Sequence, residues 1–303
     1  MIQEWTMTLT GIYPIVPTPF EKSGKLDLEG IRRLAPFMVD RGVQGLAILG
    51  VMGEAHKLTD AEREQTISAF RDALPDHLGL VVGVRAAGTD PAVEAARTAE
   101  QRGADALLVG PPPVQNDDAI FTYYQRIAGA VQVPLVIHDY PASTGILFSP
   151  ALIARLHREI EGVHFIKLED PPTGPKIDRV RALAGENLGV FGALGGMYVL
   201  EELDRGAIGI MTGFAYPELL VDIYERYRSG DVDGAATVFY DILPLIRFEF
   251  QPGLGVSLRK HILVQRGVFR TATVRHPGAQ ADEKTLEHLN WILAHLRRRG
   301  YDV

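Results

Sequence analysis

The chain has 303 residues, of which 46% are hydrophobic, and it carries a formal net charge of −7 and no cysteine. The acidic balance and the scattered Lys and Arg residues exclude the basic surface that nucleic acid or an anionic membrane would need. The lack of cysteine excludes disulfides, thiolate nucleophiles and cysteine metal sites, and it favours an intracellular protein. The length suits one large α/β barrel or two ordinary domains.

The amino terminus, "MIQEWTMTLT", has no basic region followed by an apolar one, as a secretory signal would. No stretch approaches the roughly 18 uninterrupted apolar residues of a membrane span. We therefore expect a soluble, cytoplasmic protein without a membrane segment.

Short apolar runs recur along the chain. There are eight of them, at 11–20, 45–50, 78–84, 104–110, 134–141, 163–169, 188–194 and 207–213. Segments with helical periodicity lie between them, such as 26–42, 59–75 and 90–103, and several begin at an Asp or Thr cap and end at Gly. Strand and helix are therefore expected to alternate.

Apolar character on both faces of these runs indicates a parallel sheet covered by helices, and eight βα units predict a closed (β/α)8 TIM barrel. The alternative is a doubly wound open sheet. Such sheets usually have fewer strands and a Gly-rich phosphate turn after the first strand, where this chain has "PTPF" (17–20).

Beyond residue 230 the pattern is helical only. The helical segments are "DVDGAATVFYDILPLIRFEF", "LGVSLRKHILVQRG" and "DEKTLEHLNWILAHLRRRG". We expect a barrel over 1–230 and a carboxyl-terminal extension of three helices over 231–303.

Polar residues at the carboxyl ends of barrel strands are the first candidates for chemistry, because these ends face the active site. Lys167 ends the apolar run of "VHFIKLED" (163–170) and shares a face with Glu169. A buried ammonium is costly, and apolar surroundings can lower its pKa by about three units, which gives a neutral amine able to condense with a ketone. The alternative is a structural ion pair with Glu169 or Asp170 at the rim.

A second candidate is the turn in "LGVMGEAHKLT" (49–59). Gly50 and Gly53 let the backbone approach a ligand closely, and consecutive N–H groups can hold a carboxylate. The alternative is an ordinary tight turn between a strand and a helix.

The third candidate is "VIHDYPASTG" (136–145). His138 and Tyr140 share one face of the strand and Asp139 lies on the other. Histidine is the usual proton shuttle near neutral pH, although a single strand histidine is often structural.

With the turn at 50–54, the "YP" and "STG" after the fifth run and Lys167 on the sixth, the chain resembles the dihydrodipicolinate synthase and N-acetylneuraminate lyase family over essentially its full length. The resemblance implies a (β/α)8 barrel with a helical extension, a homodimer or homotetramer, and a Schiff base between Lys167 and pyruvate or another 2-oxo acid. This chemistry needs no metal or organic cofactor, and no metal-ligand spacing is present in the sequence.

The departures from the family pattern concern its proton relay and its carboxylate contacts. Val51 and Met52 replace two Thr of the turn, and His138 replaces the strand-five Tyr. The relay Tyr after strand four falls within "GPPPVQ" (110–115), and Ser143 replaces an Arg that grips the second substrate of the synthase. These losses argue against true dihydrodipicolinate synthase activity, which is kept as an alternative.

The "KLED" motif, with Glu169 on the face of Lys167, looks more like the branch of sugar-acid dehydratases such as 2-keto-3-deoxyarabonate dehydratase. Arg85, at the end of the third run, is expected either to meet a hydroxyl or carboxylate of the substrate or to form a salt bridge at the rim. Met211, on the eighth run, is assigned to the substrate pocket.

We therefore hypothesise that neutral Lys167 attacks the ketone of a 2-oxo acid held by residues 50–53. Glu169 or His138 then removes a proton from carbon 3 and expels the carbon 4 hydroxyl, or the bond between carbons 3 and 4 breaks in a retro-aldol step. The rival readings are a barrel that binds a 2-oxo acid without turnover and a metal-dependent barrel enzyme.

Overall fold

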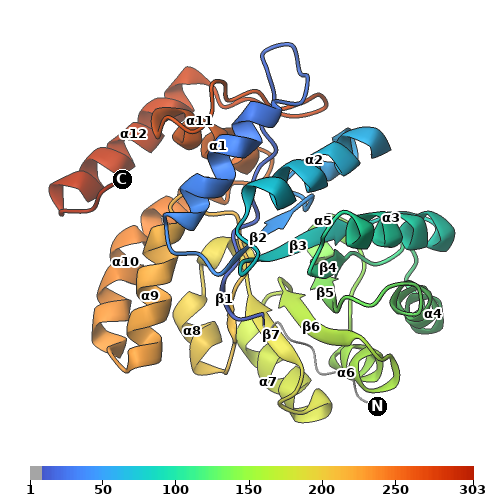
Figure 1. Cartoon of the computed structure of the whole chain (residues 1–303). Helices are drawn as coiled ribbons and strands as arrows, with labels where there is room; N and C mark the ends of the chain where they lie inside the picture. The colour runs from blue at the N-terminus through green and yellow to red at the C-terminus, as the bar shows by residue number, and fades with distance from the viewer. Residues whose placement is uncertain (1–8) are drawn as a thin grey trace.

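The computed structural model describes residues 9–303, and in these residues eight parallel strands form one sheet (Figure 1). The strands are β1 (Gly11–Ile12), β2 (Gly45–Ile48), β3 (Gly79–Val84), β4 (Ala106–Val109), β5 (Leu135–Asp139), β6 (Val163–Leu168), β7 (Gly189–Gly192) and β8 (Gly209–Ile210). Their order is β1-β8-β7-β6-β5-β4-β3-β2, so that neighbours in sequence are neighbours in space. Each of the eight predicted runs contains one strand.

The two ends of this sheet meet and close the barrel. Ile15 and Ala47 form a parallel bridge. The N–H of Ala47 donates to the Pro14 carbonyl at 2.9 Å, and the N–H of Val16 donates to the Ala47 carbonyl at 3.0 Å. The first strand is much shorter than the predicted run 11–20, because the prolines in that run cannot donate to a strand ladder. The predicted (β/α)8 barrel is confirmed.

Helices surround the barrel, as the sequence pattern predicts (Figure 1). They are α1 (Leu28–Val39), α2 (Asp60–Ala73), α3 (Thr89–Gln101), α4 (Asp117–Ala128), α6 (Pro150–Glu159), α7 (Thr173–Ala184), α8 (Val199–Asp204) and α9 (Pro217–Ser229), with the short α5 (Pro141–Thr144), η1 (Ala55–Lys57) and η2 (Leu194–Gly196) in the loops. Several begin at the predicted caps. Thr59, for example, forms a capping box with Glu62.

Three further helices follow the barrel, within the three predicted helical segments. They are α10 (Val232–Glu249), α11 (Gly255–Gln265) and α12 (Glu283–Arg298). They lie on one side of the barrel in orange and red, and α10 runs beside α9 (Figure 1). The carboxyl-terminal extension is therefore present, and its separation from the barrel at residue 230 stays a prediction.

The inside of the barrel is filled by its own apolar cluster, whose buried members are Leu9, Tyr13, Ile15, Ala47, Val81, Ala106, Leu108, Val136, Phe191 and Met211. The Tyr13 and Phe191 rings meet edge to face with centroids 5.6 Å apart. A Cβ on Gly45 would lie 2.2 Å from the Tyr13 ring, so glycine is needed there. Because the interior is filled, open space for a ligand lies at the mouth.

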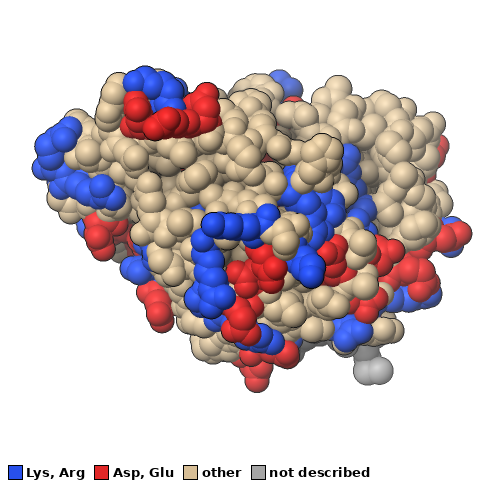
Figure 2. Space-filling view, turned by 90° about the horizontal axis from the view of Figure 1, so that it is seen from above, with Lys and Arg blue, Asp and Glu red and all other residues tan. Residues whose placement is uncertain are grey.

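Basic and acidic side chains are mixed on the surface. On the face drawn in Figure 2, Lys and Arg lie among Asp and Glu. Exposed ion pairs include Arg32 with Glu29 on α1 and Arg97 with Glu94 on α3. Within residues 9–303, no helix is both long enough and apolar enough to cross a membrane.

Candidate active site

A cavity of about 50 Å³ lies at the carboxyl ends of the strands, and residues from both the barrel and the extension line it. The barrel contributes residues at or after β1, β2, β4, β5, β6 and β8. The extension contributes Phe250, directly after α10, and Arg259 on α11. The lining residues are Ile15, Gly50, Val51, Met52, Leu108, His138, Tyr140, Lys167, Glu169, Thr212, Gly213, Phe250 and Arg259. The mouth of the barrel therefore has the concave form of a small-molecule site.

Three titratable side chains meet in this cavity. Lys167, at the end of β6, is only 4% exposed, and its Nζ donates to Glu169 Oε2. The same carboxylate oxygen lies 3.0 Å from His138 Nε2, and the Lys167 Nζ lies 3.4 Å from that nitrogen. In parallel strands β5 and β6, His138 is the register partner of Lys167, which explains why residues 29 positions apart come together.

The pKa directions in this triad suit an amine nucleophile beside a carboxylate base. Burial lowers the pKa of Lys167, and the Glu169 charge opposes this change. Burial and the Lys167 charge lower the pKa of His138, so its imidazole is neutral near pH 7. Burial opposes ionisation of Glu169, yet the Lys167 charge and the His138 hydrogen bond lower the pKa of that carboxyl to about 2. Glu169 is therefore ionised.

Tyr140 forms one wall of the cavity next to the triad. Its ring stacks on that of His138, with centroids 5.9 Å apart and an angle of 29° between the planes. The Lys167 Nζ lies 5.8 Å from the centre of the Tyr140 ring. The two rings form an aromatic surface against which the reacting carbons of a small substrate can rest.

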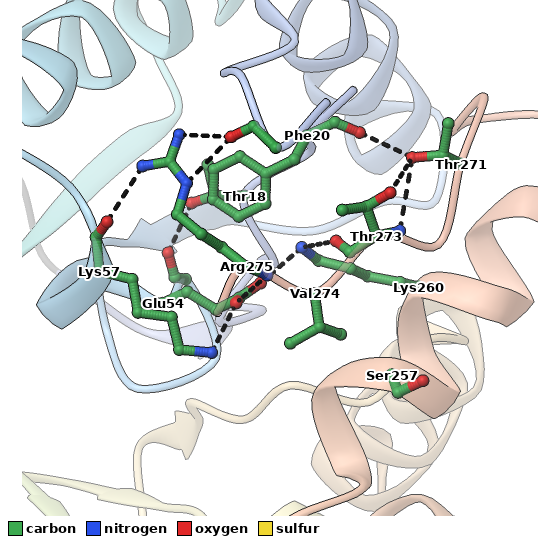
Figure 3. Close-up of polar contacts among 12 residues, drawn as sticks. Thr18, Phe20, Glu54, Lys57, Ser257, Lys260, Thr271, Thr273, Val274 and Arg275 are labelled. Atoms are coloured by element: carbon green, nitrogen blue, oxygen red, sulfur yellow. Dashed lines mark hydrogen bonds and ion pairs between the residues drawn. The ribbon is translucent and has the colours of Figure 1, made fainter. Parts of the chain in front are cut away.

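The turn after β2 is held in place by Glu54, which is not among the predicted site residues. Leu49 and Glu54 both have positive φ, at 55° and 53°. The Glu54 carboxylate accepts hydrogen bonds from Lys260 Nζ (2.5 Å), Lys57 Nζ (2.8 Å) and the Arg275 N–H (3.0 Å), as Figure 3 shows. The strained turn is thereby fixed to the carboxyl-terminal extension.

Lys260→Met is expected to destabilise the protein by about 3–5 kcal/mol, because it leaves the buried Glu54 carboxylate with less compensation. Lys260 is 0% exposed and is bound to Glu54 and to the Thr273 carbonyl. Urea unfolding of the two proteins measures the difference. The matched control is Lys284→Met, which breaks an exposed pair with Glu287 and is expected to change stability by less than about 0.5 kcal/mol. Equal effects of the two changes would contradict a structural role for the Glu54 network.

The structure brings most of the predicted site residues together. Lys167, His138 and Glu169 line the cavity, and Tyr140 and the turn residues Gly50, Val51 and Met52 line it with them. Their roles in catalysis and binding remain predictions.

The other predicted residues lie elsewhere. Gly53 lines no part of the cavity, but its carbonyl accepts a hydrogen bond of 2.6 Å from the Thr18 hydroxyl. Ser143 lies on α5, outside the cavity lining. Met211 is fully buried in the cluster inside the barrel, while the next two residues, Thr212 and Gly213, line the cavity.

Arg85 lines a second, larger cavity of about 380 Å³. This cavity shares Gly50, Val51, Leu108 and His138 with the first, so the two spaces are adjacent. Within residues 9–303, Arg85 forms no salt bridge, in contrast to the rim salt bridge considered as its alternative role. The second cavity can accept the part of a substrate that extends beyond the triad.

Sequence reasoning missed two lining residues from the extension, Phe250 and Arg259. The rule that strand ends form the site cannot find them, because they belong to helices that follow the barrel. One signal was present. Arg259 and Lys260 stand side by side within the apolar pattern of α11, and both are buried.

No cluster of three or more His, Cys, Asp and Glu side chains with the spacing of a metal site occurs among residues 9–303.

Comparisons with known proteins agree on one family. Residues 8–296 match the family described as the dihydrodipicolinate synthetase family. L-2-keto-3-deoxyarabonate dehydratase of Azospirillum brasilense is 32% identical over 274 residues, which is 88% of each protein. 4-hydroxy-tetrahydrodipicolinate synthase 1 of Streptomyces coelicolor is 33% identical over 283 residues, again 88% of each.

Solved structures show the same relationship. The crystal structure of dihydrodipicolinate synthase from Rhodopseudomonas palustris has a TM-score of 0.90 and 33% identity, covering 95% of this chain and 97% of that one. YagE, a prophage protein of E. coli K12 solved in complex with pyruvate, has a TM-score of 0.89 and 25% identity, covering 96% of this chain and 99% of that one.

Proposed function

Because the chain belongs to the dihydrodipicolinate synthetase family, we propose that it removes water from a 2-keto-3-deoxy sugar acid through a Schiff base on Lys167. Members of this family are Schiff-base lyases and dehydratases, and this chain is an enzyme of that class. The proposed dehydration rests on one observation, the contact of Lys167, Glu169 and His138 in the cavity.

The first step is attack of the neutral Lys167 amine on carbon 2 of the substrate, with loss of the ketone oxygen as water. Burial lowers the pKa of Lys167, which increases the fraction of neutral amine. The resulting protonated imine withdraws electrons from carbon 3, so that its proton becomes acidic.

Glu169 takes the proton from carbon 3. Its carboxylate is ionised, since its pKa is lowered to about 2, and it lies against the Lys167 nitrogen to which carbon 2 becomes bonded. The electron pair of the C–H bond forms the double bond between carbons 3 and 4, and the carbon 4 hydroxyl leaves as water with the proton held by Glu169. His138 Nε2, next to Glu169 Oε2, orients the carboxylate during this transfer. A proton then moves from carbon 5 to carbon 3, and the enol at carbons 4 and 5 becomes the new carbonyl group. Water hydrolyses the imine, which releases the 2-oxo acid product and returns the Lys167 amine.

Two observations favour dehydration over synthase chemistry. The turn presents the apolar side chains of Val51 and Met52 in place of hydroxyls, and His138 occupies the strand-five position of a tyrosine relay. The comparisons do not separate the two activities, because the dehydratase from Azospirillum brasilense and the synthase from Streptomyces coelicolor match over the same share of their lengths. The residues of the cavity therefore carry this choice.

The test is a product assay with a panel of 2-keto-3-deoxy pentonates and hexonates. Dehydration yields a new 2-oxo acid semialdehyde or ketone and no pyruvate, whereas aldol cleavage yields pyruvate that lactate dehydrogenase detects. We expect the first result. Pyruvate release from these acids would assign an aldolase, condensation of pyruvate with aspartate semialdehyde would assign a synthase, and binding without turnover would contradict an enzyme.

A further inference from the structure

Arg259 brings a positive charge from the carboxyl-terminal extension into the cavity that contains Lys167. It lies on α11 and lines the cavity together with the turn at residues 50–52. The residue is only 3% exposed. A buried guanidinium needs hydrogen-bond partners in place of the water it has lost. Donors that have no partner in the protein therefore indicate a ligand.

The guanidinium has donors that the protein leaves for a ligand. Its Nε donates to Glu249 Oε2 at 3.0 Å, and its Nη1 lies 3.0 Å from Met52 Sδ, which is a weak acceptor. In residues 9–303, no other hydrogen bond of this side chain is seen. A Cβ on Gly255 would lie 3.1 Å from Nη1, so glycine leaves room for the guanidinium to approach the turn. An arginine has five N–H donors, and most of them remain open.

The proposed chemistry favours a cation at this place. A 2-oxo acid brings a carboxylate next to the carbon that Lys167 attacks, and Glu169 already contributes a negative charge in the same cavity. The hydroxyls that would otherwise hold that carboxylate are absent, because Val51 and Met52 occupy the turn. A positive charge that touches Met52 offsets the repulsion between the two carboxylates.

Glu249 holds Arg259 in position through Nε and makes no hydrogen bond to the two Nη groups. It accepts from Arg259 Nε and from the Ala215 N–H through one oxygen, Oε2. Burial raises the pKa of Glu249 to about 7, against the charges of Arg259 and Arg266. Glu249 contacts the guanidinium only at Nε, so the Nη groups of Arg259 remain available to a ligand.

From this geometry we infer that Arg259 binds the carbon 1 carboxylate of the 2-oxo acid, together with the N–H groups of the turn, so that the carboxyl-terminal extension completes the active site. This inference rests on the proposed Schiff-base function. It also sets the direction of the substrate: its carboxylate lies at Arg259, and its remaining carbons extend past His138 into the cavity lined by Arg85.

The test compares pyruvate with methyl pyruvate, which has the same ketone and no charged carboxylate. Each is added at graded concentrations with borohydride, and intact mass measures the fraction of trapped protein. In Arg259→Gln the half-saturating concentration of pyruvate is expected to rise roughly 10- to 100-fold, the effect of a lost charge-assisted hydrogen bond, while that of methyl pyruvate changes by less than about twofold. Wild-type trapping by pyruvate reports on the proposed function itself.

A second variant guards against misfolding. Glu249→Gln/Arg259→Gln removes both buried charges, so neither is left without its partner, and it is expected to show the same selective loss for pyruvate. An unchanged half-saturating concentration of pyruvate, or an equal loss for both ketones, would overturn the role of Arg259 and leave the Schiff-base function standing. If wild-type protein forms no adduct with either ketone, both the function and this inference are wrong.

Discussion

Lys167→Ala is expected to lower turnover of the 2-keto-3-deoxy sugar acid by at least roughly 10³-fold, since no other group can form the imine. Lys167 is the amine that lines the cavity, in contact with Glu169 and His138. A steady-state assay of dehydration measures the loss, and circular dichroism confirms that the variant is folded.

The matched control is Lys176→Ala. Lys176 is also a buried lysine and pairs with Asp139 at 2.6 Å and Asp170 at 2.8 Å, but it does not line the cavity. Its replacement is expected to reduce stability and to keep turnover within about tenfold of the wild-type rate at a temperature where the variant is folded. Comparable loss of turnover in both variants would argue that a buried lysine of any kind supports the fold, and that Lys167 is not the nucleophile.

Glu169→Gln is expected to separate imine formation from dehydration. The amide keeps the size of the side chain and can accept the His138 hydrogen bond, but it cannot take the proton from carbon 3. Turnover should fall roughly 10²- to 10⁴-fold, the usual contribution of a general base, while borohydride still traps pyruvate on the protein. Turnover close to the wild-type rate, or loss of trapping together with turnover, would contradict this division of roles.

The pH dependence of trapping gives the same variant a second readout. Burial lowers the pKa of Lys167 and the Glu169 charge raises it, so removal of that charge lowers the pKa further. Since the neutral amine is the nucleophile, trapping by pyruvate increases as pH rises through the Lys167 pKa. The increase is expected at lower pH in Glu169→Gln than in the wild type, and initial trapping rates over a pH series measure it. A shift to higher pH would mean that Glu169 does not act on the Lys167 charge.

The barrel could be predicted from sequence because each of its strands and helices has a pattern within its own short segment. The buried strands, such as "GLVVGV" of β3, are short runs that are apolar on both faces, and several helices begin at a side-chain cap, such as Thr59 of α2. Strand lengths were less predictable. The first predicted run covers ten residues, whereas β1 has two, because its prolines interrupt the ladder.

The members of the triad could also be anticipated, since His138, Lys167 and Glu169 stand at the carboxyl ends of neighbouring barrel strands. Their pairing could not, because the register of β5 and β6 shifts between Leu135 and Val136. Residues whose position depends on long-range packing could not. Met211 and Thr212 are neighbours on the chain, and only the depth of β8 in the barrel decides which one reaches the cavity. Arg259 reaches it because α11 folds back over the mouth, which no pattern within the helix specifies.

Peptide mapping of the wild-type protein after borohydride reduction with pyruvate tests the central claim most directly. The buried lysines of residues 9–303 that could react with pyruvate are Lys167, Lys176 and Lys260. The account predicts one pyruvate-derived mass on the peptide that contains Lys167 and none on the peptides with Lys176 or Lys260. An adduct on either of those lysines, or no adduct at saturating pyruvate, would contradict it.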